Sequence, residues 1–62
     1  MNSKEIIKRL QHDGWILHHT KGDHCQFKHP KKSGKVTVPH PKKDLPIGTL
    51  RNIYKQAGWI WQ

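Results

Sequence analysis

The spacing of apolar residues most restricts the fold of this chain, because the period of the pattern changes twice. Near both ends, apolar side chains recur every three or four residues, which is typical of amphipathic helices. These residues are Ile6, Ile7 and Leu10 in the first segment, and Leu50, Ile53, Tyr54 and Ala57 in the second. Between them lie three short runs rich in β-branched and aromatic residues. The sequence therefore predicts the order α-β-β-β-α in a single domain over residues 1–62.

Capping residues place the helix boundaries. Ser3 is a favourable N-cap for a helix that reaches about His12, and Gly14 is a natural stop. Pro46 suits the first turn of the second helix, and Gly58 would end that helix.

The three central runs predict strands over residues 15–20, 24–29 and 35–38. The facing of the first strand is open, because Trp15 and Leu17 compete with Ile16 for the core. The second strand alternates better, with Cys25 and Phe27 on the face opposite to His24.

We expect an α+β fold in which a three-stranded antiparallel sheet carries both helices packed on one face. The other face would stay open to solvent, and His24 would point toward it if the face of Cys25 and Phe27 is the core. The double-stranded RNA-binding domain, which recognises RNA by shape, has the same element order.

The charge points to a polyanionic partner. Twelve Lys and Arg stand against four Asp and Glu, which gives a net charge of +8. Such a field favours nucleic acid, an acidic protein or an anionic lipid surface. Lipid is the least favoured of the three, because neither predicted helix combines a wide apolar face with a basic one.

The remaining composition points to the cytoplasm. Cys25 is the single cysteine, so no disulfide is available, which favours a reducing compartment. No stretch is apolar and long enough for a signal peptide or a membrane span. We therefore expect a cytoplasmic protein that does not contact the membrane.

Most kinds of catalysis are disfavoured by the residues present. The histidines and Cys25 lack the paired spacing of a zinc site, and His24 and His29 fall on opposite faces of one strand. Cys25 is expected to face inward, which disfavours thiol catalysis. Four acidic residues are few for two-metal nuclease chemistry. We therefore expect no metal and no cofactor, and histidine must carry any phosphodiester chemistry.

Histidine suits RNA cleavage, because RNA carries its own nucleophile, the 2′-hydroxyl group. An imidazole can accept the 2′ proton or protonate the leaving 5′ oxygen. Lysines such as Lys21 and Lys28 could offset the charge of the transition state. On these grounds His18, His19 and His24 are equal candidates, and an exposed histidine that only binds is the alternative.

Several short motifs are spread over nearly the whole chain. They are Gly14-Trp15, Lys21-Gly22-Asp23-His24, Phe27-Lys28-His29-Pro30, Val36-Thr37-Val38-Pro39-His40, Asp44-Leu45-Pro46-Ile47-Gly48-Thr49-Leu50-Arg51-Asn52-Ile53 and Gln56-Ala57-Gly58. Together these motifs resemble the HicA family, the toxin half of bacterial toxin–antitoxin pairs.

The resemblance implies a dsRBD-like fold and a metal-independent mRNA interferase toxin that cleaves mRNA and arrests translation and growth. It also implies that the histidine of the Gly-x-His motif, here His24 after Gly22, is the catalytic residue. Asp23 departs from the serine or glycine that is usual between them. From charge and position, we expect Lys21, Lys28 and the loop pair 42–43 to contact RNA phosphates; the loop residues are Lys42 and Lys43. Gly22 is expected to belong to the RNA-binding surface as well.

The resemblance further implies a HicB-like antitoxin that covers the active site. The antitoxin would bind DNA, so this chain would reach DNA only through it, and the toxin alone is expected to be monomeric. The competing interpretations are a non-catalytic RNA-binding module on the same basic face and a pure protein-interaction domain. The second acid–base group is left open among four candidates, which are His18, His19, His29 and His40.

Overall fold

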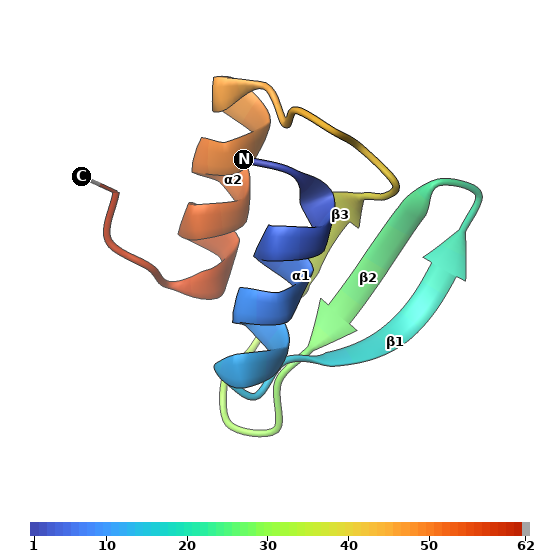
Figure 1. Ribbon diagram of the computed structural model, residues 1–62. Helices are drawn as coiled ribbons and strands as arrows, with labels where there is room; N and C mark the ends of the chain where they lie inside the picture. The colour runs from blue at the N-terminus through green and yellow to red at the C-terminus, as the bar shows by residue number, and fades with distance from the viewer. Residues whose placement is uncertain (62) are drawn as a thin grey trace.

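The predicted order of two helices around three strands is confirmed in the computed structural model, which describes residues 1–61. The elements are α1 (Ser3–His12), β1 (Ile16–Lys21), β2 (His24–Lys28), β3 (Val36–Pro39) and α2 (Ile47–Ala57). The strands form one antiparallel sheet in the order β1-β2-β3. Both helices lie on one side of the sheet, and the β1–β2 hairpin extends past them (Figure 1). The predicted α+β architecture is therefore confirmed.

The core lies between the helices and the strands β2 and β3. Every helix and strand except β1 contributes to it, because the apolar positions of the two helical stripes face the inward positions of the sheet. Its buried members are Ile6, Leu10, Trp15, Cys25, Phe27, Val36, Val38, Leu45, Ile53 and Ala57. All six residues of β1 are exposed. This strand is thus held by its pairing with β2 and has little part in the core.

The start of α1 differs from the prediction, because Asn2 and not Ser3 caps the helix. The Asn2 side chain accepts a hydrogen bond from the Glu5 amide at 2.8 Å, and the Glu5 carboxylate accepts one from the Asn2 amide, which completes a capping box. Ser3 is only 2% exposed. Its hydroxyl accepts from the Lys42 amide and bonds His40 Nδ1, both at 2.8 Å. Ser3 therefore anchors the loop after β3 instead of the helix end.

The facing of the first strand follows from burial and pairing, since Leu17 pairs with the buried Phe27 and therefore lies on the core side with Trp15. Trp15 is 1% exposed and belongs to the core, whereas Ile16 and Leu17 are 64% and 51% exposed. The register between β1 and β2 shifts between Leu17 and His19. A bulge of this kind inserts an extra residue and breaks the alternation of the strand. The residues from His19 to the turn are therefore offset by one position from the alternation that Trp15, Ile16 and Leu17 set.

Other ends of the helices and strands differ from the prediction by one residue. The strand β2 ends at Lys28, and β3 runs to Pro39. Pro46 takes the N-cap position of α2 and not its first turn, and no side chain caps that end. The helix stops at Gly58, as predicted.

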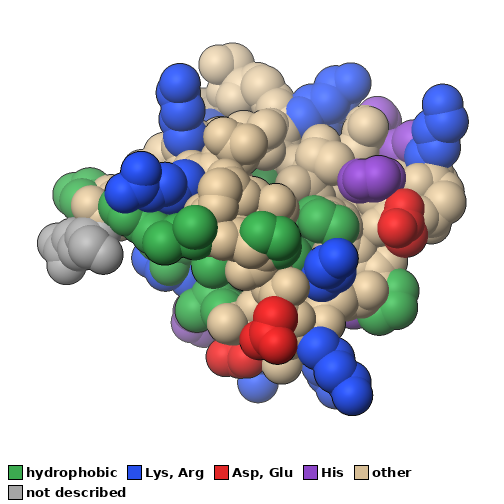
Figure 2. All heavy atoms as spheres, turned by 90° about the horizontal axis from the view of Figure 1, so that it is seen from above, with side chains coloured by type: hydrophobic (Ala, Val, Ile, Leu, Met, Phe, Trp, Pro, Cys, Tyr) green, Lys and Arg blue, Asp and Glu red, His purple; other side chains and the backbone are tan. Residues whose placement is uncertain are grey.

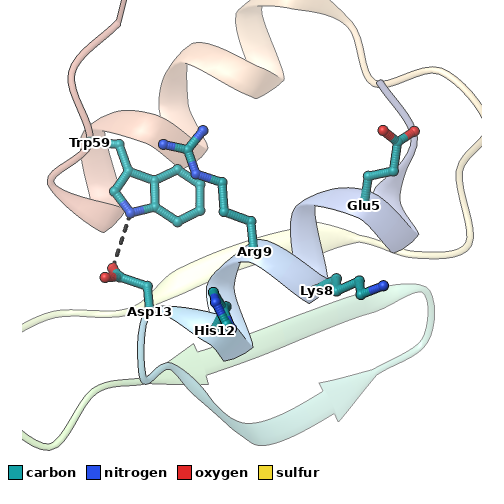
Figure 3. Close-up of a pocket in the computed structure, with 6 residues that line it drawn as sticks. All are labelled: Glu5, Lys8, Arg9, His12, Asp13 and Trp59. Carbon is teal, nitrogen blue, oxygen red and sulfur yellow. Dashed lines mark hydrogen bonds between the residues drawn. The ribbon is translucent and has the colours of Figure 1, made fainter.

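Asp13 ties the carboxyl-terminal tail to the rest of the fold (Figure 3). Its Oδ2 accepts hydrogen bonds from Trp59 Nε1 at 3.0 Å, Lys32 Nζ at 3.2 Å and Trp15 Nε1 at 3.3 Å. The Arg9 guanidinium lies 4.1 Å from the centroid of the Trp59 ring. Hydrogen bonds from Trp59 and then Lys32 lower the pKa of Asp13. The segment after α2 therefore packs on α1 through Trp59.

Candidate active site

The candidate catalytic histidine is placed by a two-residue hairpin turn. Lys21 and His24 are paired across β1 and β2, so Gly22 and Asp23 alone form the turn. Gly22 has φ +59°, whereas the φ of Asp23 is not positive. Glycine first and a residue with negative φ second is the pattern of a type II′ turn, whose twist matches that of the strands. The Gly-x-His spacing thus sets His24 at the first position of β2.

His24 lies on the face of the sheet that the helices leave open. Its neighbour Cys25 is buried in the core, so alternation along β2 points His24 to the other side. The His24 side chain is 57% exposed. Its Nδ1 lies 3.2 Å from Oδ1 of Asp23. This contact is an ion-pair distance and not a hydrogen bond, and it places the carboxylate where it can influence the orientation of the ring.

The register shows which side chains share this open face, because directly paired residues of neighbouring strands point to the same side. Lys21 is the direct partner of His24 on β1. His19 is the partner of Gln26, two residues further along both strands. Lys28 lies at the far end of β2, paired with Ile16. The open face therefore carries two of the four expected phosphate contacts, Lys21 beside His24 and Lys28 four residues away.

The other expected contacts, Lys42 and Lys43, follow β3 at the same end of the sheet. The backbone links this loop to the catalytic turn, since the His40 amide donates to the Asp23 carbonyl at 2.7 Å. Both lysines border a hollow of about 470 Å³ beside the start of α1. They lie near the helix side of the sheet, unlike Lys21 and Lys28.

Figure 2 looks onto this end of the molecule. At its right-hand side, where Figure 1 places the β1–β2 hairpin, histidine and lysine side chains lie on one side of an exposed carboxylate. Asp23 is the acidic residue of that hairpin. The surface around the candidate site is therefore cationic, which suits a phosphate backbone.

A second hollow, of about 660 Å³, lies along α1 beneath Trp59 (Figure 3). It is lined by Glu5, Lys8, Arg9, His12, Asp13 and Trp59. None of these residues belongs to the strands that carry His24. We therefore assign the candidate chemistry to the exposed sheet face and not to this larger hollow.

The contacts of His29 give this residue a structural role. His29 bonds the Asp13 carbonyl through Nε2 at 2.9 Å, and its Nδ1 accepts from the amides of Lys31 and Lys32. Both ring nitrogens are thus engaged with backbone, and the ring also packs edge-on against Trp15. This role in holding the β2–β3 loop was not predicted. The spacing of residues in the sequence gives no sign of this role, because the partners of His29 come from the residue after α1 and from the loop after β2.

Among residues 1–61, no three His, Cys, Asp or Glu side chains are grouped so that they could hold a metal ion. In the same residues, neither helix is both long and apolar enough to cross a bilayer. Cys25 is a free, buried thiol.

Comparison with known proteins decides the family. The model of the family described as the HicA toxin of bacterial toxin–antitoxin systems matches residues 3–59, which include every expected site residue. The chain belongs to the HicA toxin family. The resemblance that the sequence motifs indicated is therefore confirmed.

Two solved structures support the same assignment. A chain from a structure described as the HicA3 and HicB3 toxin–antitoxin complex aligns with a TM-score of 0.83 and 35% identity, over 100% of both chains. A toxin–antitoxin complex from Streptococcus pneumoniae aligns with a TM-score of 0.76 and 36% identity, over 94% of this chain and 97% of the other. No curated protein matches this HicA chain.

Proposed function

We propose that this HicA-family chain is an endoribonuclease toxin that cleaves mRNA without a metal and thereby arrests translation and growth. The observation that carries the proposal is the position of His24. It is exposed at the start of β2, beside Asp23 and opposite Lys21, on the sheet face that no helix covers.

The geometry suits attack by the RNA's own 2′-hydroxyl group. Asp23 Oδ1 lies 3.2 Å from Nδ1 of His24, so a small turn of the ring would let the carboxylate accept the Nδ1 proton and leave Nε2 as a free acceptor. Nε2 can then take the proton from the 2′ oxygen as that oxygen attacks the phosphorus. Lys21, directly across the strand pair, offsets the negative charge of the pentacoordinate transition state. Asp23 is thus an orienting residue in this member of the family, and the predicted roles of Lys28, Lys42 and Lys43 are phosphate contacts along the path.

We further propose that a HicB-like antitoxin binds this chain and covers His24. The two similar solved structures are both toxin–antitoxin complexes. A protein of net charge +8 attracts an acidic inhibitor and RNA to the same surface, so one occupant excludes the other. The toxin would act in the cytoplasm as a monomer and would reach DNA only through its antitoxin.

The test is cleavage of RNA by the purified chain in the presence of excess chelator. We expect fragments with a 5′-hydroxyl end and a 2′,3′-cyclic phosphate, or a 3′-phosphate after hydrolysis. A matched oligonucleotide with a single 2′-deoxy substitution at the mapped cleavage site should bind equally and stay intact. Binding with no cleavage would instead identify a non-catalytic RNA-binding module, and no affinity at low salt would identify a protein-interaction domain.

A further inference from the structure

Cleavage through the 2′-hydroxyl group needs a second group, which protonates the 5′ oxygen as it leaves. His24 can serve as the base, but the proposed function leaves the acid unnamed. The contacts of His29 and His40 make both unsuitable. Both nitrogens of His29 are bonded to backbone at the opposite end of β2. His40 follows Pro39, the open-face partner of His24, and its ring reaches the buried hydroxyl of Ser3 on the helix side.

The register of the β1–β2 hairpin singles out His19. It lies two residues before Lys21, which is the direct partner of His24, so His19 and His24 are diagonal neighbours on the same face. The irregularity in β1 lies before His19, between Leu17 and His19, and the pairing from His19 to the turn is regular. Diagonal neighbours of an antiparallel pair lie about 7–8 Å apart at Cα, with their side chains closer.

This separation suits two groups that flank one phosphate. Each group must come within about 2.6–3.2 Å of its oxygen, and the two oxygens lie on opposite sides of the phosphorus along the line of displacement. Lys21 completes a triangle with the two histidines, so its ammonium group can face the non-bridging oxygens. His18 is the extra residue of the bulge and has no partner in the register, one position further from the turn.

We propose that His19 is a further catalytic residue, the general acid that works with His24 across the β1–β2 hairpin; the proposal rests on the proposed ribonuclease function. The 2′ oxygen forms a bond to phosphorus, and its proton passes to Nε2 of His24. The bond from phosphorus to the 5′ oxygen breaks, and the imidazolium of His19 gives that oxygen a proton. The products are a 2′,3′-cyclic phosphate and a 5′-hydroxyl end. His19 is then neutral and His24 protonated, and exchange with water restores both.

The experiment compares two substrates cut at one mapped site. One is an ordinary RNA oligonucleotide, and in the other sulfur replaces the bridging 5′ oxygen, which gives a leaving group that needs no proton from an acid. His19→Ala should slow cleavage of the ordinary RNA by about 10²-fold or more, within the range of general acid catalysis. The same variant should cleave the sulfur substrate nearly as fast as the wild-type protein cleaves that substrate. His24→Ala should be slow on both substrates, because the loss of a base is not compensated by a better leaving group.

Controls separate this role from a structural one. His18→Ala, a change of the same kind at the neighbouring exposed residue, should cleave both substrates like the wild type. The pH profile of His19→Ala should lose its alkaline limb, which reports the acid, and keep the acidic limb. His19→Gln, which keeps most of the side chain's volume, should behave like His19→Ala if the proton is what matters.

Each other outcome overturns the inference. If His19→Ala cleaves ordinary RNA at the wild-type rate while His24→Ala is inactive, His19 is not the general acid, and the proposed ribonuclease function stands without it. Equal slowing of His19→Ala on both substrates would show a structural or binding role. Rescue of His24→Ala by sulfur would reverse the assignment of acid and base. If His24→Ala cleaves at the wild-type rate, or the wild type does not cleave RNA, the proposed function falls and the role of His19 falls with it.

Discussion

Replacing Gly22 by alanine tests whether the turn conformation itself positions the catalytic histidine. The positive φ of +59° at Gly22, at a turn position that glycine favours, costs an L-residue about 1–3 kcal/mol. A Cβ built at Gly22 meets no atom of any residue beyond its two chain neighbours within 4 Å, so this penalty comes from the local backbone conformation and not from packing. The unfolded chain also loses freedom when alanine replaces glycine, which offsets about 0.4–1 kcal/mol. We therefore expect the hairpin to be destabilised by about 1 kcal/mol, roughly a fivefold change in its opening equilibrium.

The rate of RNA cleavage should fall by a larger factor than the change in the hairpin's opening equilibrium, because an altered turn displaces both Asp23 and His24. Gly34 offers a matched control in the β2–β3 loop, since it has φ +84° and also has open space around its Cβ position. Both alanine variants should lose similar stability in thermal unfolding, about 4–8 °C in Tm per kcal/mol if the whole domain responds. Only Gly22→Ala should cleave a standard oligonucleotide more than about fivefold more slowly. A synthetic chain with D-alanine at position 22 should recover the rate, because D-residues favour positive φ. Equal cleavage by the two alanine variants would refute the reasoning.

Two further predictions concern the contacts that hold the fold. Ser3→Ala should lower the free energy of unfolding in a denaturant titration by about 1–3 kcal/mol, because the Lys42 amide loses its acceptor, whereas the exposed Ser33→Ala should have no effect. Asp13→Asn should be less stable than the wild type at neutral pH, because Asp13 accepts from Trp59 and its folded-state pKa is lowered. A lowered pKa stabilises the fold above the ordinary value of 3.8, so the difference should shrink as the pH falls below that value toward the folded-state pKa. Thermal unfolding of the two proteins from pH 7 to pH 2 measures this, and a difference independent of pH would contradict it.

The fold was predictable because its periodic signals agree with the tertiary structure. Phe27 and Ile53 fall at positions that both the local pattern and the packing bury. The prediction of the fold was wrong where two neighbouring residues could serve equally well in the same local role. Asn2 and Ser3 are both good capping residues, and the choice depends on the loop after β3, which needs the buried hydroxyl of Ser3.

The site was predictable only in part, for a similar reason. The family motif pointed to His24, and alternation in β2 placed it on the open face. The sequence could not separate His19 from His18, because the bulge that decides their register is a property of the paired strands. It also could not show that His29 is bonded to Asp13, which lies far from it in the chain.

The most direct test of the account is the single-turnover rate of RNA cleavage by His24→Ala, beside His12→Ala as a control on the exposed surface of α1. Both variants should keep the unfolding temperature of the wild type, because neither residue is buried. We predict that His12→Ala cleaves normally and that His24→Ala is slower by about 10²-fold or more. A folded His24→Ala protein that cleaves RNA at the wild-type rate would contradict the account.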